Sequence, residues 1–248
     1  MAPTSGSSSA ITMISGSELL TVNIDGTCRD QKRKGVRMKA ESKPSITPTA
    51  NGPYVVKALK KFVNQKGPIE TRDTMALCRC GGSANKPFCD GTHAKIGFSS
   101  AKLEGRVEDK RESYKAKRIT IHDNRGICAH AGRCTDGLAS VFRLKEEPWI
   151  HPDAASADEI IATIEKCPSG ALSYSVDEVE HRDRDGEPTI FVAPNGPYVV
   201  SGGPDLVDTE RQEGASKEHF TMCRCGGSKN KPFCDGTHWH INFKDDKN

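Results

Sequence analysis

The chain has 248 residues, of which 35% are hydrophobic and 6% aromatic, and this composition favours several small modules over one large core. Its 36 basic and 33 acidic residues leave a formal net charge of +3, so charge alone does not indicate binding to nucleic acid. No apolar run approaches the roughly 20 residues of a membrane-spanning helix, and a membrane span is therefore not expected.

The first 45 residues are rich in Ser, Thr, Gly, Lys and Arg, and apolar residues gather only at 18–24. We expect residues 1–45 to form a mostly disordered arm with one short strand. The Ser-rich start leaves organelle targeting open, although the first basic residue is Arg29 and no signal-peptide pattern is present. The protein is thus expected to be intracellular and cytoplasmic, with its 10 cysteines reduced.

Two segments of the chain occur twice. Asn51–Val56 is repeated identically as Asn195–Val200, and Cys78–His93 is repeated with a single difference as Cys223–His238. Such repetition indicates that one supersecondary unit is used twice. The two copies are placed at residues 46–104 and 187–248.

The longer repeat has the spacing Cys-x-Cys-x8-Cys-x3-His, which brings four metal-binding side chains into sixteen residues. Cysteines separated by one residue rarely form structural disulfides, so metal-bound thiolates are the better interpretation. A Gly-Gly pair after the second Cys lets backbone approach closely, and the Asp-Gly before the His fits the start of a helix. Three thiolates and one imidazole suit either a structural zinc or a 2Fe-2S cluster with one His ligand.

Both copies resemble the CDGSH iron-sulfur domain of the NEET family at every motif position, including Ser83 and Ser228, Pro87 and Pro232, and Thr92 and Thr237. The resemblance implies one 2Fe-2S cluster in each copy. Its expected ligands are Cys78, Cys80, Cys89 and His93 in the first copy and Cys223, Cys225, Cys234 and His238 in the second. The resemblance also implies an internal pseudo-dimer, packed around Tyr54, Tyr198 and the neighbouring Val pairs. The alternative is a zinc-binding structural repeat.

Between the copies, residues 115–176 are expected to form a separate α+β module. Residues 117–122 alternate like a strand, and 123–126 are typical of a turn. Ser156–Glu159 is a capping box that predicts a helix through Lys166, with Ile160, Ile161 and Ile164 on its buried side. The helix is expected to end at Cys167-Pro168, because Pro disfavours helical geometry in the residue before it.

This middle segment resembles the divergent single-cluster ferredoxin-type domain through Cys128, Cys134 and Cys167, the last followed by Pro168. Bacterial ferredoxins space their cysteines at two-residue intervals, and here Ala131 stands where the second Cys would be. Three ligands would suit a 3Fe-4S cluster, or a 4Fe-4S cluster whose fourth iron has another ligand. His130 is a local candidate for that other ligand, whereas Cys28 lies far away in the expected arm and is not expected to serve. The alternative is three buried structural cysteines.

The predicted fold class is α+β, with two small β-rich CDGSH modules and an inserted ferredoxin-like module. The leading functional prediction is electron transfer, and the alternatives are cluster storage, transfer or sensing through release at protonated His93 or His238, and a zinc-stapled interaction module. No catalytic residues are expected, since no dinucleotide or phosphate-binding motif is present. The expected partner is a redox protein or an apo iron-sulfur acceptor, and the expected state is a monomer.

Overall fold

The computed structural model describes residues 13–15, 18–20 and 42–248, and the chain divides into two units, Met1–Ala40 and Glu41–Asn248. In the first unit, strands β1 (Met13–Ser15) and β2 (Glu18–Leu20) pair antiparallel. The strand expected within 18–24 thus begins at its predicted position. The rest of the predicted N-terminal arm, and Cys28 with it, lies outside the described residues.

One sheet of the second unit contains strands from both repeats. It has the order β14-β3-β4-β7. Strands β3 (Ser45–Pro48), β4 (Tyr54–Lys57) and β7 (Thr74–Leu77) come from the first repeat and pair antiparallel. Strand β14 (Asp205–Leu206), from the second repeat, lies parallel to β3 at the edge.

A second sheet makes the reciprocal exchange, in the order β15-β13-β12-β5-β6. Strands β12 (Thr189–Val192), β13 (Tyr198–Ser201) and β15 (Phe220–Met222) belong to the second repeat. Strands β5 (Lys61–Asn64) and β6 (Gly67–Pro68) come from the first repeat, and β5 pairs parallel with β12. Neither sheet is therefore complete within one copy of the repeat.

The two sheets enclose one shared hydrophobic core. The repeated Tyr-Val-Val segments alternate along β4 and β13, so that Tyr54, Val56, Tyr198 and Val200 are fully buried while the Val between each pair is half-buried. The rings of Tyr54 and Tyr198 meet edge to face with centroids 6.0 Å apart. The other buried members of this core are Ile46, Leu59, Phe62, Met75, Leu77, Ile190, Val192, Phe220, Met222 and Phe233.

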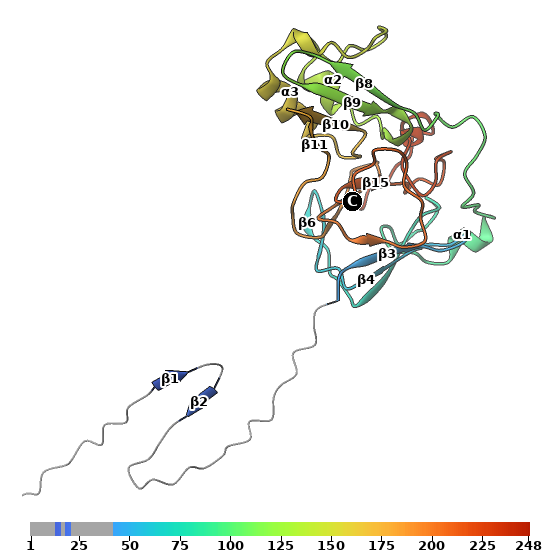
Figure 1. Ribbon diagram of the computed structural model, residues 1–248. Coiled ribbons are helices and arrows are strands. Elements are labelled where there is room, and N and C mark those ends of the chain that lie inside the picture. Colours follow the sequence, from blue (N-terminus) through green and yellow to red (C-terminus); the bar gives the residue numbers. More distant parts are fainter. Residues whose placement is uncertain (1–12, 16–17, 21–41) are drawn as a thin grey trace, which may run out of the picture. The chain divides into compact units, whose positions relative to one another are not determined.

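The middle module has its own sheet and core. Its antiparallel sheet has the order β11-β10-β9-β8, formed by β8 (Arg111–Lys115), β9 (Thr120–Asn124), β10 (Leu172–Val176) and β11 (Val179–His181). Helices α2 (Arg133–Gly137) and α3 (Ala157–Ile164) lie beside it (Figure 1). Two short 3-10 turns span Arg125–Ile127 and Pro152–Ala154.

The helix predicted in this module is present and its capping box is confirmed, but the helix ends at Ile164 and not at Lys166, because the amides of Lys166 and Cys167 already bond three residues back. The Ser156 hydroxyl accepts from the Glu159 amide, and the Glu159 carboxylate accepts from the Ser156 amide. Ile160 and Ile164 are buried as expected, whereas Thr163 takes the third buried position and Ile161 is half-buried.

The turn predicted at 123–126 begins later than expected. Asp123 and Asn124 continue β9, because both pair with β8, and the Asn124 side chain then caps the 3-10 turn that follows. The sequence alternation ends at residue 122, but strand pairing extends β9 two residues further, through the buried Asp123 and Asn124.

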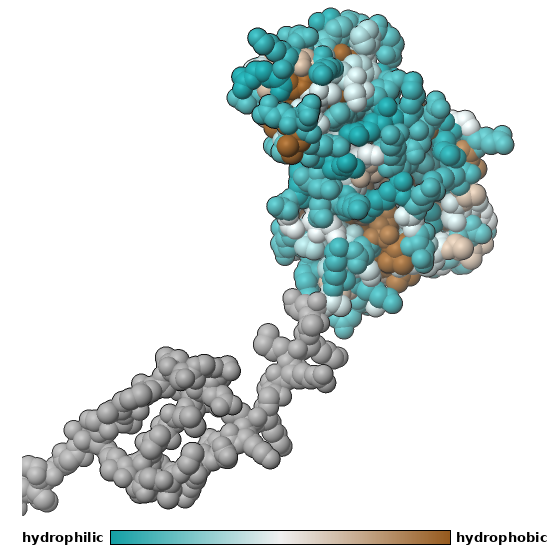
Figure 2. Space-filling view, in the orientation of Figure 1, coloured by the Kyte–Doolittle hydropathy of each residue, from teal (hydrophilic) through white to brown (hydrophobic). Residues whose placement is uncertain are grey.

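The remaining helices are single turns, α1 (Thr92–Lys95) and α4 (Thr237–His240), one in each repeat. The face of the molecule shown in Figure 2 is mostly hydrophilic, with apolar residues in small groups. Among the residues that the structure describes, no helix has the length and apolarity to cross a membrane.

Replacing Tyr198 with Phe should lower the free energy of unfolding by about 1–2 kcal/mol, because its buried hydroxyl donates to the carbonyls of Cys78 and Pro87. Tyr54→Phe should have the same effect, since that hydroxyl donates to the carbonyls of Cys223 and Pro232. Urea unfolding of the purified protein, followed by circular dichroism, measures the loss. Tyr174→Phe is the matched control, because only burial and the Glu165 charge, and no hydrogen bond from the described residues, act on the Tyr174 hydroxyl. An equal loss in the control would contradict the prediction.

Candidate metal centres

The first repeat brings its three cysteines and His93 into one loop after β7. After β7 the chain turns and comes back alongside the end of the strand. Two backbone hydrogen bonds hold the returning segment there: the Cys78 amide donates to the Pro87 carbonyl at 2.8 Å, and the Cys89 amide donates to the Ala76 carbonyl at 2.8 Å. Cys89 therefore lies beside the residues that precede Cys78. The Cys78 and Cys80 sulfurs are 3.9 Å apart.

The short helix α1 then turns His93 back toward Cys89. The helix begins directly after its N-cap Gly91, so His93 lies in its first turn, and the Cys89 Sγ lies 3.3 Å from the His93 Nδ1. The predicted helix start at Asp90-Gly91 is confirmed. Hydrogen bonds to the Asp90 carboxylate, first from the Thr92 side chain and then from the Thr92 and Ala84 amides, hold the pKa of Asp90 well below its usual value.

The second repeat builds the same loop. The Cys223 and Cys225 sulfurs are 3.8 Å apart, and the Cys234 Sγ lies 3.4 Å from the His238 Nδ1. The Asp235 carboxylate ties the loop to α4 as Asp90 does in the first repeat. In both repeats the structure therefore gathers the predicted ligands into two close pairs, Cys with Cys and Cys with His.

The two loops touch each other. Cys80 and Cys225 form an isolated antiparallel bridge. A Cβ on Gly81 would lie 2.4 Å from the Cys225 carbonyl oxygen, and one on Gly226 would lie 2.4 Å from the Cys80 carbonyl oxygen. Both glycines also have positive φ angles, so no other residue fits either position without strain. The Gly-Gly pairs thus permit close approach of the two loops.

The three cysteines of the middle module line a common cavity. Cys128 follows a 3-10 turn, Cys134 lies on α2 and Cys167 follows α3. Burial raises the pKa of Cys128 to about 12 and that of Cys134 to about 11, and the neighbouring Cys167 charge adds to both shifts. These thiols would therefore stay protonated at neutral pH unless a bound cation stabilised the thiolates.

His130 and Ala131 take different places around this cavity. Ala131 lines it, whereas the His130 ring lies against the second repeat, where a Cβ on Gly236 would come within 2.8 Å of the imidazole Cδ2. Asp123 also lines the cavity, and burial raises its pKa to about 6. Sequence reasoning missed Asp123, since it was assigned to a turn.

The middle cavity and the second loop are neighbours. The Asn230 side-chain amide donates to the Gly126 carbonyl at 2.9 Å and joins the second loop to the 3-10 turn before Cys128. Burial is the main cause of the raised pKa of Cys234, and the charge of Cys128 in the middle module also raises it, which shows that the two sites lie close together. The corresponding side of the first loop is open, because a Cβ on Gly91 would meet no heavy atom within 4 Å.

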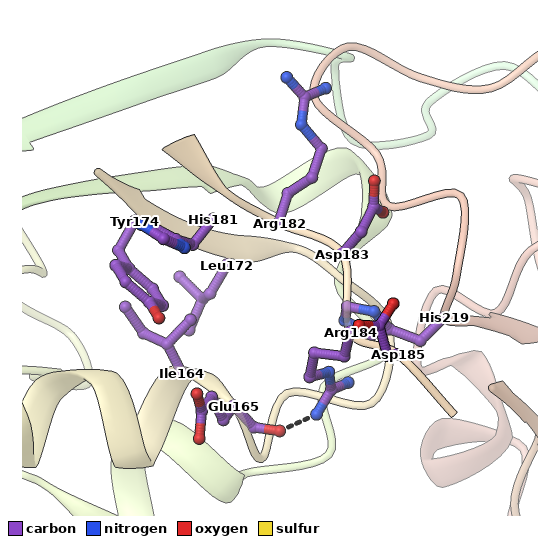
Figure 3. Close-up of a pocket in the computed structure, with 10 residues that line it drawn as sticks. All are labelled: Ile164, Glu165, Leu172, Tyr174, His181, Arg182, Asp183, Arg184, Asp185 and His219. Carbon is purple, nitrogen blue, oxygen red and sulfur yellow. Dashed lines mark hydrogen bonds between the residues drawn. The ribbon is translucent and has the colours of Figure 1, made fainter. Parts of the chain in front are cut away.

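A separate pocket of about 300 Å³ lies beside the middle module (Figure 3). In Figure 3, Arg184 reaches back to the Glu165 carbonyl at the end of α3, and it also donates to the Cys167 carbonyl at 2.9 Å. The buried His219 shares a hydrogen bond with the Ser216 hydroxyl through its Nδ1 atom, and burial lowers the pKa of His219 to about 3. Sequence reasoning left His219 unassigned and missed Arg184, because neither belongs to a recognisable motif.

Comparison with known proteins agrees with this arrangement. The family model described as iron-binding zinc finger, CDGSH type, matches residues 51–94 and 195–239, and the model described as divergent 4Fe-4S mono-cluster matches residues 114–177. The uncharacterized protein YjdI of Escherichia coli K12 is 41% identical over 61 residues, which cover 25% of this chain and 80% of YjdI. YjdI of Escherichia coli O157:H7 has the same values. No solved structure matches the chain significantly.

These matches confirm the predicted order of domains along the chain. Two regions match the CDGSH model, and the region between them matches the mono-cluster model, in the order expected from the cysteine motifs. The chain belongs to the iron-sulfur cluster-binding proteins that carry CDGSH domains, with two such domains on either side of a divergent 4Fe-4S mono-cluster domain.

Proposed function

We propose that the protein is an electron carrier with three iron-sulfur clusters. Each CDGSH loop holds a 2Fe-2S cluster through three cysteines and one histidine, and the middle module holds a 3Fe-4S or 4Fe-4S cluster through Cys128, Cys134 and Cys167. The cluster ligands are Cys78, Cys80, Cys89 and His93 in the first loop, and Cys223, Cys225, Cys234 and His238 in the second. Each cluster supplies reversible one-electron chemistry when bound.

The arrangement of donors among the described residues favours a binuclear cluster over zinc in each CDGSH loop. A single tetrahedral zinc ion draws all four ligands to about 2.0–2.3 Å from one point, which places them about 3.4–3.8 Å from each other. The distances of 3.9 and 3.3 Å within the two donor pairs of the first loop would suit either kind of site, so the discriminating observation is whether three or more donors converge. In the part of the chain that the structure describes, no three His, Cys, Asp or Glu side chains converge on one ion. Two ligands for each of two irons fit this arrangement.

The contact between consecutive sites is the observation that carries the electron-transfer proposal. The first loop touches the second through Cys80 and Cys225, and the second touches the middle module through Asn230 and His130. Three sites thus lie in the order middle, second, first. A store for clusters would not require contiguous sites, whereas a relay of electrons does.

The same contacts support an internal pseudo-dimer. Each repeat lends strands to the other's sheet, β14 in one direction and β5 with β6 in the other. The reciprocal hydrogen bonds of Tyr54 and Tyr198 relate the two copies in the same way. We infer that the chain works as a monomer whose two CDGSH domains replace the subunits of a dimer.

Cluster donation to an acceptor protein is the second candidate, and one observation favours it. Cys89 and His93 are half-buried, whereas their counterparts Cys234 and His238 are 3% and 5% exposed. An acceptor could therefore reach the ligands of the first loop. A zinc-stapled interaction module is disfavoured, because no three metal-binding side chains converge on one ion among the described residues.

The test of the proposal combines composition with kinetics. Iron and sulfide analysis of anaerobically purified protein should give about seven or eight irons per chain and no stoichiometric zinc. Stopped-flow reduction should then show electrons passing to a one-electron acceptor without loss of iron. If no electrons pass to the acceptor but the clusters move to an apo-ferredoxin, the result would favour cluster donation over electron transfer. Two zincs in a colourless sample would overturn both.

Replacing His93 with Cys should lower the reduction potential of the first cluster, on the order of 100 mV, because a thiolate makes the ligand set more negative than an imidazole. His238→Cys should lower the potential of the second cluster in the same way. Redox titration followed by visible absorption measures both changes. His240→Ala, at an exposed position close to the second loop, is the control and should leave both potentials unchanged. Unchanged potentials in the two Cys variants would remove the histidines from the ligand set.

Replacing Cys128 with Ser should remove only the third cluster, about three or four irons per chain, and leave the 2Fe-2S absorption of both CDGSH loops. The middle module has a sheet and core of its own, so the loss should stay local. Iron analysis and electron paramagnetic resonance (EPR) spectroscopy measure the result. Cys28→Ser serves as the comparison and should retain all the iron. Full iron content in Cys128→Ser would mean that the middle cysteines are structural.

A further inference from the structure

The two CDGSH loops differ in the charge around an arginine that both contain. Arg79 and Arg224 stand between the first two cysteines of their motifs, and both side chains are buried, at 4% and 1% exposure. Each guanidinium lies over a Tyr and a Phe of its own repeat. The carbon Cζ of Arg79 is 5.1 Å from the Tyr54 ring centroid and 5.8 Å from that of Phe98.

The charge of the second arginine is neutralised, and each nitrogen of its guanidinium group has a hydrogen-bond partner. Arg224 forms a buried ion pair with Asp245, donates from Nε to the Gly196 carbonyl at 2.8 Å and from Nη2 to the Ala193 carbonyl at 2.8 Å. The Asp245 side chain is only 2% exposed, so solvent hardly screens this pair.

Among the described residues, the first arginine has neither a carboxylate partner nor a full set of hydrogen-bond acceptors. Arg79 donates from Nη1 to the Thr49 carbonyl at 3.1 Å, and its buried Nε has no partner among the described residues. A buried positive charge without a counter-ion is costly and acts strongly on neighbouring charges, because the surrounding dielectric is low.

One position in the sequence accounts for the difference. The Asp245 amide donates to the Asn195 Oδ1 at 2.7 Å, and the Ser100 amide donates to the Asn51 Oδ1 at 2.9 Å. Asn51 and Asn195 are themselves equivalent in the repeated segments. Ser100 therefore occupies in the first repeat the place of Asp245 in the second, and it brings no charge to Arg79.

We propose that Arg79, left without a counter-ion by Ser100, gives the first CDGSH cluster a higher reduction potential than the second, where Asp245 neutralises Arg224. Reduction adds a negative charge, which an uncompensated cation stabilises. The surroundings act in the same direction, since the second loop lies beside the thiolates of the middle module and the first loop faces solvent. The inference deepens the proposed function and rests on it.

The proposal sets the direction of electron flow within the chain. A one-electron donor protein reduces the middle or second site, one electron then passes from the second site to the first, and the first site gives it to a one-electron acceptor protein. The second site is oxidised as the first is reduced, and no bond is formed or broken. The open side of the first loop, around Asp90 and Gly91, is where the acceptor would approach.

The test exchanges the two residues. Ser100→Asp and Asp245→Ser are made singly and together in the full chain loaded with clusters, and redox titrations are followed by EPR. His238→Cys, made separately, identifies the signal of the second cluster. The unaltered chain should show two potentials that favour reduction of the first cluster at least tenfold, about 59 mV for one electron. Ser100→Asp should reduce this preference at least tenfold by lowering the first potential, and Asp245→Ser should do so by raising the second.

Two asparagine variants separate the effect of charge from other effects of the substitutions. Ser100→Asn should leave the first potential unchanged, and Asp245→Asn should raise the second as Asp245→Ser does, even if the serine variant folds poorly. Equal potentials in the unaltered chain, or no shift in Ser100→Asp and Asp245→Asn, would overturn the inference. Shifted potentials without electron delivery to any acceptor would overturn the proposed function but not the charge assignment. A chain without reducible CDGSH clusters would overturn both.

Discussion

The arrangement of the two CDGSH loops depends on a reciprocal interaction between two buried tyrosines. Tyr54 donates from the first repeat to the loop that contains Cys223, and Tyr198 donates from the second repeat to the loop that contains Cys78. Each loop is thus held by the other copy, and the rings contact each other at the centre of the core. A shift of either repeat would move the Cys and His side chains of the other repeat's loop, so the core fixes the distance between the two loops.

Asymmetry enters this nearly symmetric frame through the inserted module. The second loop is covered by it, which buries Cys234, His238 and Asn230, whereas the first loop keeps its outer face in solvent. Sequences that are almost identical therefore have different electrostatic surroundings. The difference arises from what packs against each loop and from single residues outside the motif, such as Ser100 and Asp245.

The sequence predicted the parts of the structure that are local or repeated. The helix starts at Asp90-Gly91 and Asp235-Gly236 and the capping box at Ser156 depend on short-range spacing and were correctly placed. The exchange of strands between repeats was not predictable, because pairing of β5 with β12 joins segments more than a hundred residues apart. The roles of Arg184 and Asp123 also depend on tertiary contacts, which no periodicity records.

The exchange of strands has a consequence for the synthesis of the chain. A ribosome completes residues 46–104 long before it produces Tyr198, whose hydroxyl holds the loop of Cys78 across 120 positions of sequence. The nascent first repeat also lacks β14, which comes from residues 205–206. The loop that contains Cys78 can therefore reach its final form only after residues 198–206 have been synthesised, so the first CDGSH domain depends on the second for its folding.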